Sequence, residues 1–126
     1  MNTVHQIVKC ETCGNIVEVL DGGKQMTEAC HKPQTLVEKT EDVGTEKHTP
    51  VIEVSDHEIK VTIGSVPHPM EDAHFIQWIE LVAGDKVYRQ MLHPGSPAVA
   101  VFPKVIGPFI VREYCNLHGL WKKENK

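Results

Sequence analysis

A cysteine and a histidine stand three residues apart near the end of the chain, in the stretch EYCNLHGLW that covers residues 113–121. A thiol and an imidazole at this spacing permit two kinds of chemistry, metal ligation or nucleophilic attack by a cysteine with a histidine as its base. The second kind also needs a group that orients the base and donors that stabilise an oxyanion, and the sequence offers neither. Cys115 and His118 therefore indicate a metal site whose other ligands must be sought upstream.

Eight histidines occur in this chain of 126 residues, a surplus that favours metal binding. Three of them stand at the edges of predicted strands. His48 directly precedes one strand, whereas His68 and His74 bracket the loop that joins two others. Pro67 and Pro69 stiffen the chain on both sides of His68, which would help to hold a ligand in place.

Four imidazoles and one thiolate, if they meet, make a set of five ligands. A structural zinc site usually closes with four ligands, so the fifth argues against that kind of site. Neutral imidazoles combined with a soft thiolate suit iron or copper. Five ligands around iron leave one coordination position open, and a thiolate opposite that position pushes electron density toward whatever binds there. Such a set predicts a site that does chemistry.

The elements that must position these residues are short strands. From Thr49 onward, apolar runs of strand length alternate with turn signals, and residues 59–63 alternate apolar and polar with period two. The predicted strands cover 51–54, 59–63, 75–82, 86–92, 98–102 and 109–114. This spacing is typical of an antiparallel β-sandwich of the immunoglobulin type, in which loops from several strands gather at one end. The five candidate ligands could meet there, and the only helix-like segment is a single turn over 70–74.

The composition divides the chain into residues 1–37 and 38–126. The first block contains three of the four cysteines, and it is too small to bury a core without a staple. A metal bound by cysteines could be that staple. The segment 38–47, EKTEDVGTEK, is polar and charged, and it predicts a linker or an exposed loop. We therefore expect a small first domain followed by the β-sandwich.

The net charge is −4, which gives no general footprint for nucleic acid or for a membrane surface, so an anionic ligand needs a local positive feature. No window approaches the roughly 18 apolar residues that a transmembrane helix requires. The first residues, MNTVHQIVKCETCG, lack the basic and apolar regions of a secretion signal. We expect a cytoplasmic protein whose cysteines serve as ligands or reactive groups and not as disulfides.

Four longer motifs contain the candidate ligands. They read EKHTP (46–50), GSVPHPM (64–70), HFIQWI (74–79) and CNLHGLW (115–121). In these motifs the sequence resembles the desulfoferrodoxin/neelaredoxin family of superoxide reductases, and the resemblance covers essentially the whole chain. It implies a mononuclear non-haem iron that changes between Fe²⁺ and Fe³⁺, with four imidazole ligands and an axial thiolate. By the family pattern the ligands are His48, His68, His74, His118 and Cys115.

The same resemblance implies the activity, in which superoxide takes up one electron and two protons and leaves as hydrogen peroxide, without formation of dioxygen. It implies Glu46 as the residue that occupies the sixth position of the oxidised iron. It also implies Lys47 as the residue that attracts the anion and organises proton delivery. A lysine beside an exposed metal would supply the local positive field that the net charge lacks. A rubredoxin-type protein is the implied electron donor, and a homodimer is the expected assembly.

Two other functions stay open at the level of sequence. A non-catalytic electron-transfer protein would use the same iron, although an electron carrier gains from a closed and rigid coordination sphere. A β-sandwich binding module with a structural metal would suit the fold, but it would not need five ligands that include a cysteine of axial type. The open coordination position thus favours an enzyme over both.

The cysteines of the first block raise a separate question about metal. The stretch CETCG (10–14) is typical of a metal knuckle, and the longer family members hold a second iron with four cysteines in a desulforedoxin-like domain. Here Ala29 stands where the resemblance calls for a cysteine. One hypothesis is a site without metal, and another is a labile metal with water as its fourth ligand. The third is an iron or zinc held by Cys10, Cys13, Cys30 and His31. His31 and Ala29 lie on opposite sides of Cys30, which counts against the third hypothesis.

Overall fold

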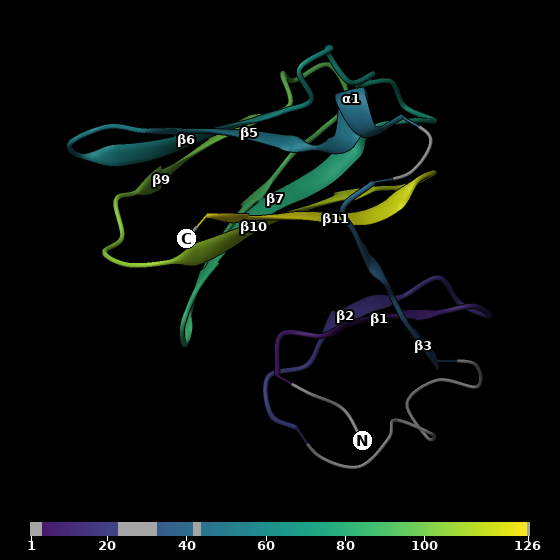
Figure 1. Cartoon of the computed structure of the whole chain (residues 1–126). Coiled ribbons are helices and arrows are strands. Elements are labelled where there is room, and N and C mark those ends of the chain that lie inside the picture. The colour runs from purple at the N-terminus through teal and green to yellow at the C-terminus, as the bar shows by residue number, and fades with distance from the viewer. Residues whose placement is uncertain (1–3, 23–32, 42–43, 126) are drawn as a thin grey trace. The chain divides into compact units, whose positions relative to one another are not determined.

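The computed structural model describes residues 4–22, 33–41 and 44–125 of the chain (Figure 1). The chain divides into two compact units, Met1–Val37 and Glu38–Lys126. Each unit has its own sheet or sheets and its own buried residues.

The first unit is a small three-stranded antiparallel sheet. Its strands are β1 (Ile7–Cys10), β2 (Ile16–Glu18) and β3 (Pro33–Thr35). The central strand β1 pairs with both neighbours, so Val8 faces Val17 on one side and Thr35 on the other. Ile7, Val8 and Cys10 are buried, which gives the described part of this unit only a minimal apolar core.

The second unit is a sandwich of two sheets. One sheet has the strand order β4-β11-β10-β7-β8, and the other has the order β5-β6-β9. In Figure 1 the smaller sheet lies over the larger one. The larger sheet contains β4 (Glu38–Lys39), β7 (Ile76–Ala83), β8 (Lys86–Met91), β10 (Phe109–Cys115) and β11 (Gly119–Asn125). The smaller sheet contains β5 (Pro50–Val54), β6 (Glu58–Ile63) and β9 (Val99–Pro103). This architecture confirms the predicted fold class, an all-β chain with a small first unit and an immunoglobulin-like sandwich.

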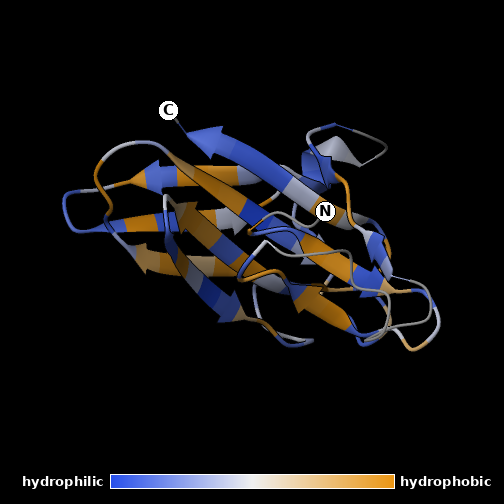
Figure 2. Ribbon diagram, turned by 90° about the horizontal axis from the view of Figure 1, so that it is seen from below, coloured by the Kyte–Doolittle hydropathy of each residue, from blue (hydrophilic) through white to orange (hydrophobic). Residues whose placement is uncertain are grey.

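Alternating side chains from both sheets form the core of the sandwich. Ile59, Val61 and Ile63 on β6 are buried and pack with Leu81 on β7 and Val111 on β10. Figure 2 shows the alternation as orange and blue bands along the strands. Burial of one such aliphatic side chain stabilises a fold by roughly 1.5–3 kcal/mol. The core therefore makes a rigid base for the loops at the ends of the strands.

Three local predictions need correction. The segment 38–47 is not a plain linker, because β4 begins at Glu38 and a one-turn helix, α1 (Thr45–His48), follows it. The predicted turn over 70–74 is not helical, and Glu71 and His74 instead exchange backbone hydrogen bonds in an isolated β-bridge. Strand β11 was not predicted at all.

No helix in the described part of the chain is long and apolar enough to cross a membrane.

Candidate metal centre

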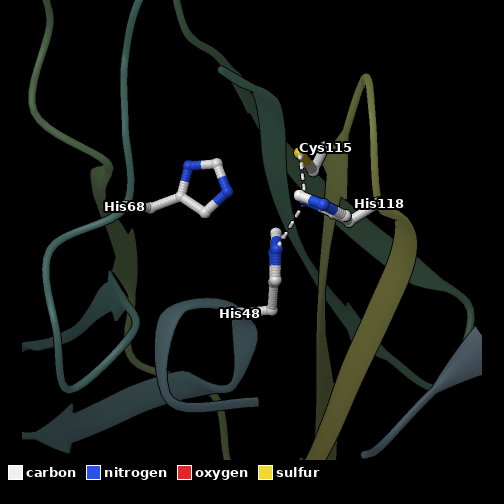
Figure 3. A group of neighbouring side chains, drawn as sticks. All are labelled: His48, His68, Cys115 and His118. Atoms are coloured by element: carbon white, nitrogen blue, oxygen red, sulfur yellow. Dashed lines mark hydrogen bonds between the residues drawn. The ribbon is translucent and has the colours of Figure 1, made fainter. Parts of the chain in front are cut away.

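Histidine and cysteine side chains from three separate segments meet at one end of the sandwich. His48 ends α1, His68 lies in the connection between β6 and β7, Cys115 ends β10, and His118 lies in the turn that leads to β11. One potential ligand atom from each of these four residues lies within 4.8 Å of the other three (Figure 3). Segments up to 70 residues apart in sequence thus supply one group of donors, as their positions at strand ends predicted.

His74 belongs to the same cluster, because the four imidazole rings form a closed ring of neighbours. The ring centroids of His48 and His68 are 4.5 Å apart, and those of His68 and His74 are 4.9 Å apart. His74 lies 5.0 Å from His118, and His118 lies 4.9 Å from His48. All four contacts are edge-on. Four imidazoles arranged in this way can surround one ion.

The free ring nitrogens point to metal ligation. His68 Nδ1 lies 2.7 Å from the carbonyl oxygen of Pro69, which can only accept, so Nδ1 carries the hydrogen and Nε2 keeps a lone pair. The buried Nε2 atoms of His68 and His74 have no hydrogen-bond partner among the described residues. His118 Nδ1 lies 3.1 Å from His48 Nε2 and 3.8 Å from Cys115 Sγ, the two contacts dashed in Figure 3. These residues fit a transition metal with imidazole and thiolate ligands.

The electrostatics of the cluster lower the pKa values of three of its imidazoles, those of His48, His68 and His74, and so favour their neutral forms. Burial, followed by the neighbouring imidazoles, lowers the pKa of His48 to about 3. Burial is also the largest cause of the lowered pKa values of His68 and His74. Burial raises the pKa of the Cys115 thiol, so formation of the thiolate there requires a nearby positive charge. Neutral imidazoles are the form that binds a metal, and a metal would supply the charge that the thiolate needs.

Two glycines position α1 and its polar residues. The N–H groups of Lys47 and His48 donate to the carbonyl oxygen of Gly44, which has a φ of 85°. Gly64 has a φ of 83°, and a Cβ there would lie 2.6 Å from the carbonyl oxygen of Lys47. Val66 N–H donates to the carbonyl oxygen of Glu46 at 3.1 Å, so the loop after β6 holds the backbone of α1. The side chains of Glu46 and Lys47 are exposed beside the buried His48.

The Cys115–His118 loop is coupled to the loop that carries His74. The pairing of β10 with β7 shifts register between Tyr114 and Cys115, an irregularity of the kind that re-aims side chains near functional sites. The residue after Cys115 is Asn116, and its side-chain amide bonds to the backbone of both residues that flank His74. Its Oδ1 accepts from the N–H of Phe75 at 3.0 Å, and its Nδ2 donates to the carbonyl oxygen of Ala73 at 3.0 Å. Asn116 therefore holds the backbone on which His74 is mounted.

Two further residues near the cluster were missed by sequence reasoning. The Trp121 ring stacks on His48, with centroids 4.8 Å apart and planes 12° apart, and its Nε1–H donates to the carbonyl oxygen of His118 at 3.1 Å. Glu113 is fully buried, its Oε1 lies 3.8 Å from His48 Nδ1, and burial raises its pKa to about 9. A charged residue at position 113 inside an apolar strand was the only signal for it in the sequence.

The cysteines of the first unit are arranged differently from the prediction. Cys10 is disulfide-bonded, which differs from the expectation that the cysteines form no disulfides. Cys13 is exposed and free, and its backbone N–H points at Cys10 Sγ at 3.4 Å. Cys30 and His31 lie outside the described residues. Because Ala29 stands in place of a cysteine, three cysteines remain where the resemblance calls for four, and the disulfide at Cys10 removes that thiolate from any such ligand set.

Both units match families of known proteins. Residues 40–124 match the family model "Desulfoferrodoxin", and residues 2–36 match "Desulfoferrodoxin, N-terminal domain". The desulfoferrodoxin of Syntrophotalea carbinolica is 58% identical over 120 residues, which cover 94% of this chain and 95% of the relative. The crystal structure of the superoxide reductase from Treponema pallidum superposes with a TM-score of 0.75 at 27% identity, over 94% of this chain and 95% of that one. The superoxide reductase (1Fe-SOR) from Giardia intestinalis gives a TM-score of 0.58 at 29% identity, over 64% of this chain and 98% of that one.

Proposed function

The chain belongs to the desulfoferrodoxin family, and we propose that it is a superoxide reductase with one catalytic iron in its second unit. The reaction consumes one superoxide, one electron and two protons, and it yields one hydrogen peroxide. What a bound iron supplies is the electron, through its ferrous and ferric states. The four imidazoles and the cysteine at the end of the sandwich are the residues that would hold it.

The observation that carries this proposal is the composition and placement of the donor set. Five donors of two kinds, imidazole and thiol, gather from His48, His68, His74, Cys115 and His118. A structural metal is usually saturated by four ligands, whereas five donors that include a thiol would suit a metal that also takes part in a reaction. The solved superoxide reductases that superpose on this chain support the same assignment.

We assign the substrate-directed roles to the two exposed residues of α1. Lys47 attracts the anion, because it adds a local positive charge to a protein with a net charge of −4, and it takes part in proton delivery. Its charge is among the causes that lower the pKa values of His68 and His74, after burial in both cases, which supports its closeness to the cluster. By the family resemblance, Glu46 would supply a further carboxylate ligand to a bound iron.

Rapid mixing of the reduced, iron-loaded protein with stoichiometric superoxide tests the proposal. We expect fast oxidation of the iron, followed through its visible absorption, and one peroxide for each superoxide consumed. Evolution of dioxygen together with half that yield of peroxide would indicate dismutation and overturn the proposal. Iron that stays reduced in the presence of superoxide would overturn it as well.

A lysine variant separates substrate attraction from general charge. Lys47→Met should slow the second-order reaction and reduce its dependence on ionic strength. The control is Lys86→Met, which removes the same charge from the exposed start of β8, where Lys86 pairs with Ala83 at the far end of β7 from His74. Equal effects of the two substitutions would remove Lys47 from the mechanism.

Other parts of the proposal rest on the family resemblance. We propose a rubredoxin-type protein as the electron donor, a homodimer as the assembly, and the cytoplasm as the location.

Metal analysis addresses the first unit, whose candidate ligands are Cys10, Cys13 and Cys30. One iron per chain is the expected result, and two would show that this unit also binds metal despite the alanine at position 29.

A further inference from the structure

A lysine outside the recognised motifs reaches the metal centre from the edge of the larger sheet. Lys39 is the second residue of β4, a two-residue strand that pairs in parallel with β11, so that Lys39 lies beside Trp121. Its Nζ donates to the carbonyl oxygen of His118 at 3.2 Å. The same ammonium lies 5.8 Å from the centre of the Trp121 ring. One positive charge thus contacts the backbone of a candidate ligand and an aromatic ring behind the cluster.

Trp121 connects this charge to a second candidate ligand. Its ring stacks on His48, and its indole N–H donates to the same His118 carbonyl oxygen that accepts from Lys39. This carbonyl group therefore receives two donors, one neutral and one charged. Both donors support the turn that carries His118, Trp121 through a part-buried bond and Lys39 through an exposed bond that is strengthened by its charge.

The position of Lys39 is set by its neighbours and not left to a flexible side chain alone. The preceding residue, Glu38, accepts from Arg112 Nη1 at 3.3 Å, and Lys122 Nζ lies 3.9 Å from its other oxygen. Arg112 is buried and also bonds to the fully buried Glu80. The short strand β4 is therefore anchored beside β11 by a partly buried ion pair between Glu38 and Arg112 as well as by its backbone.

The lysine stem lies beside Gly119. A Cβ at Gly119 would lie 3.9 Å from Lys39 Cε and 4.0 Å from Nζ, within ordinary van der Waals contact. The Lys39 side chain therefore runs along the turn between β10 and β11.

We propose that Lys39 is a positioning residue of the metal centre, which braces the His118 turn and keeps a positive charge beside the bound iron. This inference rests on the iron centre proposed above. A nearby positive charge favours whichever redox state carries less positive charge, so Lys39 raises the reduction potential of the iron. The residue does not contact the substrate in this scheme, which distinguishes it from Lys47. Because Lys39 is only half-buried and its bond to the His118 carbonyl oxygen is exposed, the effect of its charge is screened by salt.

The midpoint potential of the iron, measured by redox titration of its visible absorption, tests this role. Lys39→Met should shift the potential downward, because it removes the charge but keeps an unbranched stem. Lys39→Arg should restore a value close to that of the parent protein. The matched control is Lys123→Met, which removes the same charge from an exposed position on β11, two residues beyond Trp121.

The outcomes separate this inference from the proposed function. A Lys39→Met protein with the parent's potential would overturn the role of Lys39, even if the parent reduces superoxide as expected. A Lys123→Met protein shifted as far as Lys39→Met would also overturn it, because net charge alone would then explain the change. A parent protein without any reversible iron couple would overturn the iron centre and this inference together. A downward shift for Lys39→Met that shrinks at high salt and is reversed by Lys39→Arg would support it.

Discussion

Replacement of Asn116 by alanine should weaken metal binding without touching a ligand. The Asn116 side chain bonds to the peptide groups on both sides of His74, through the carbonyl oxygen of Ala73 and the N–H of Phe75. A ligand whose backbone is fixed in this way loses little freedom when it binds a metal. Without the amide, the His74 loop would have to be ordered by the metal itself, and that ordering would lower the affinity.

The structure sets the expected magnitude of this effect. A protein hydrogen bond contributes about 0.5–1.5 kcal/mol to stability, with less expected where water can replace it. The bond from Phe75 is partly buried and the bond to Ala73 is exposed, so their combined contribution is about 2 kcal/mol. If all of it served to hold His74, its loss would lower the metal affinity by about 30-fold, since 1.4 kcal/mol corresponds to tenfold. This figure lies within the ~10–100-fold range typical of residues that support metal ligands.

Two measurements address the prediction. Urea unfolding of the metal-free protein gives the change in stability, and competition with a ferrous chelator gives the change in affinity. Leu117→Ala is the matched control, because Leu117 is the next residue of the same loop and its side chain is 61% exposed. We expect that control to bind iron as tightly as the parent protein does.

A double-mutant cycle decides whether Asn116 acts through His74. In a His74→Ala background the loss caused by Asn116→Ala should largely disappear, because there is no imidazole left to position. The reasoning is wrong if Asn116→Ala lowers the affinity equally in both backgrounds. It is also wrong if Asn116→Ala lowers the urea midpoint but leaves the affinity of the otherwise unchanged protein intact.

Three further predictions follow from single contacts. Cys115→Ser should abolish the thiolate-to-iron charge-transfer band, and an unchanged visible spectrum would show that Cys115 is not a ligand. Gly64→Ala forces a side chain into a positive φ and against the carbonyl oxygen of Lys47, so it should lower the melting temperature and slow the reaction with superoxide, as calorimetry and rapid mixing can verify. Glu80→Ala removes the fully buried carboxylate that bonds to Arg112, although Glu38 still accepts from that guanidinium, and it should destabilise the metal-free protein by up to about 3–5 kcal/mol in urea unfolding, while the iron spectrum stays unchanged.

Sequence reasoning predicted the candidate donors that the structure brings together, because their chemistry does not depend on the details of packing. Imidazole and thiol groups at strand ends are unusual enough to be noticed, and a sandwich brings strand ends together. The strands of the core were equally accessible through their alternating apolar residues, as β6 illustrates. The predicted and observed bounds of the main strands accordingly differ by only a few residues.

The elements that sequence reasoning missed owe their structure to distant contacts. Strand β11 is polar along much of its length and becomes a strand only because β10 provides a long pairing partner, from Phe109 to Cys115. The turn of α1 depends on Gly44 at one end and on the loop at Gly64 packed against it. From the sequence alone, Lys39 is one of the charged residues of a predicted linker, and only its pairing with Trp121 in the structure shows that it lies in a strand. Local propensity carries none of this information, because each case depends on tertiary contacts.

The polar groups left without partners show what the site is built to receive. Among the described residues, the buried side-chain atoms that lack a hydrogen bond include the Nε2 atoms of His68 and His74 and both carboxyl oxygens of Glu113. A buried polar group without a partner costs about 1–3 kcal/mol, so gathering several of them weakens the metal-free fold. A bound ligand can offset this free-energy cost by interacting with the unpaired groups. Here the two imidazole lone pairs belong to the candidate ligand set, so a bound metal would be that ligand. The metal-free protein should therefore be the less stable form, and bound metal should stabilise the second unit in proportion to the logarithm of its concentration over its Kd.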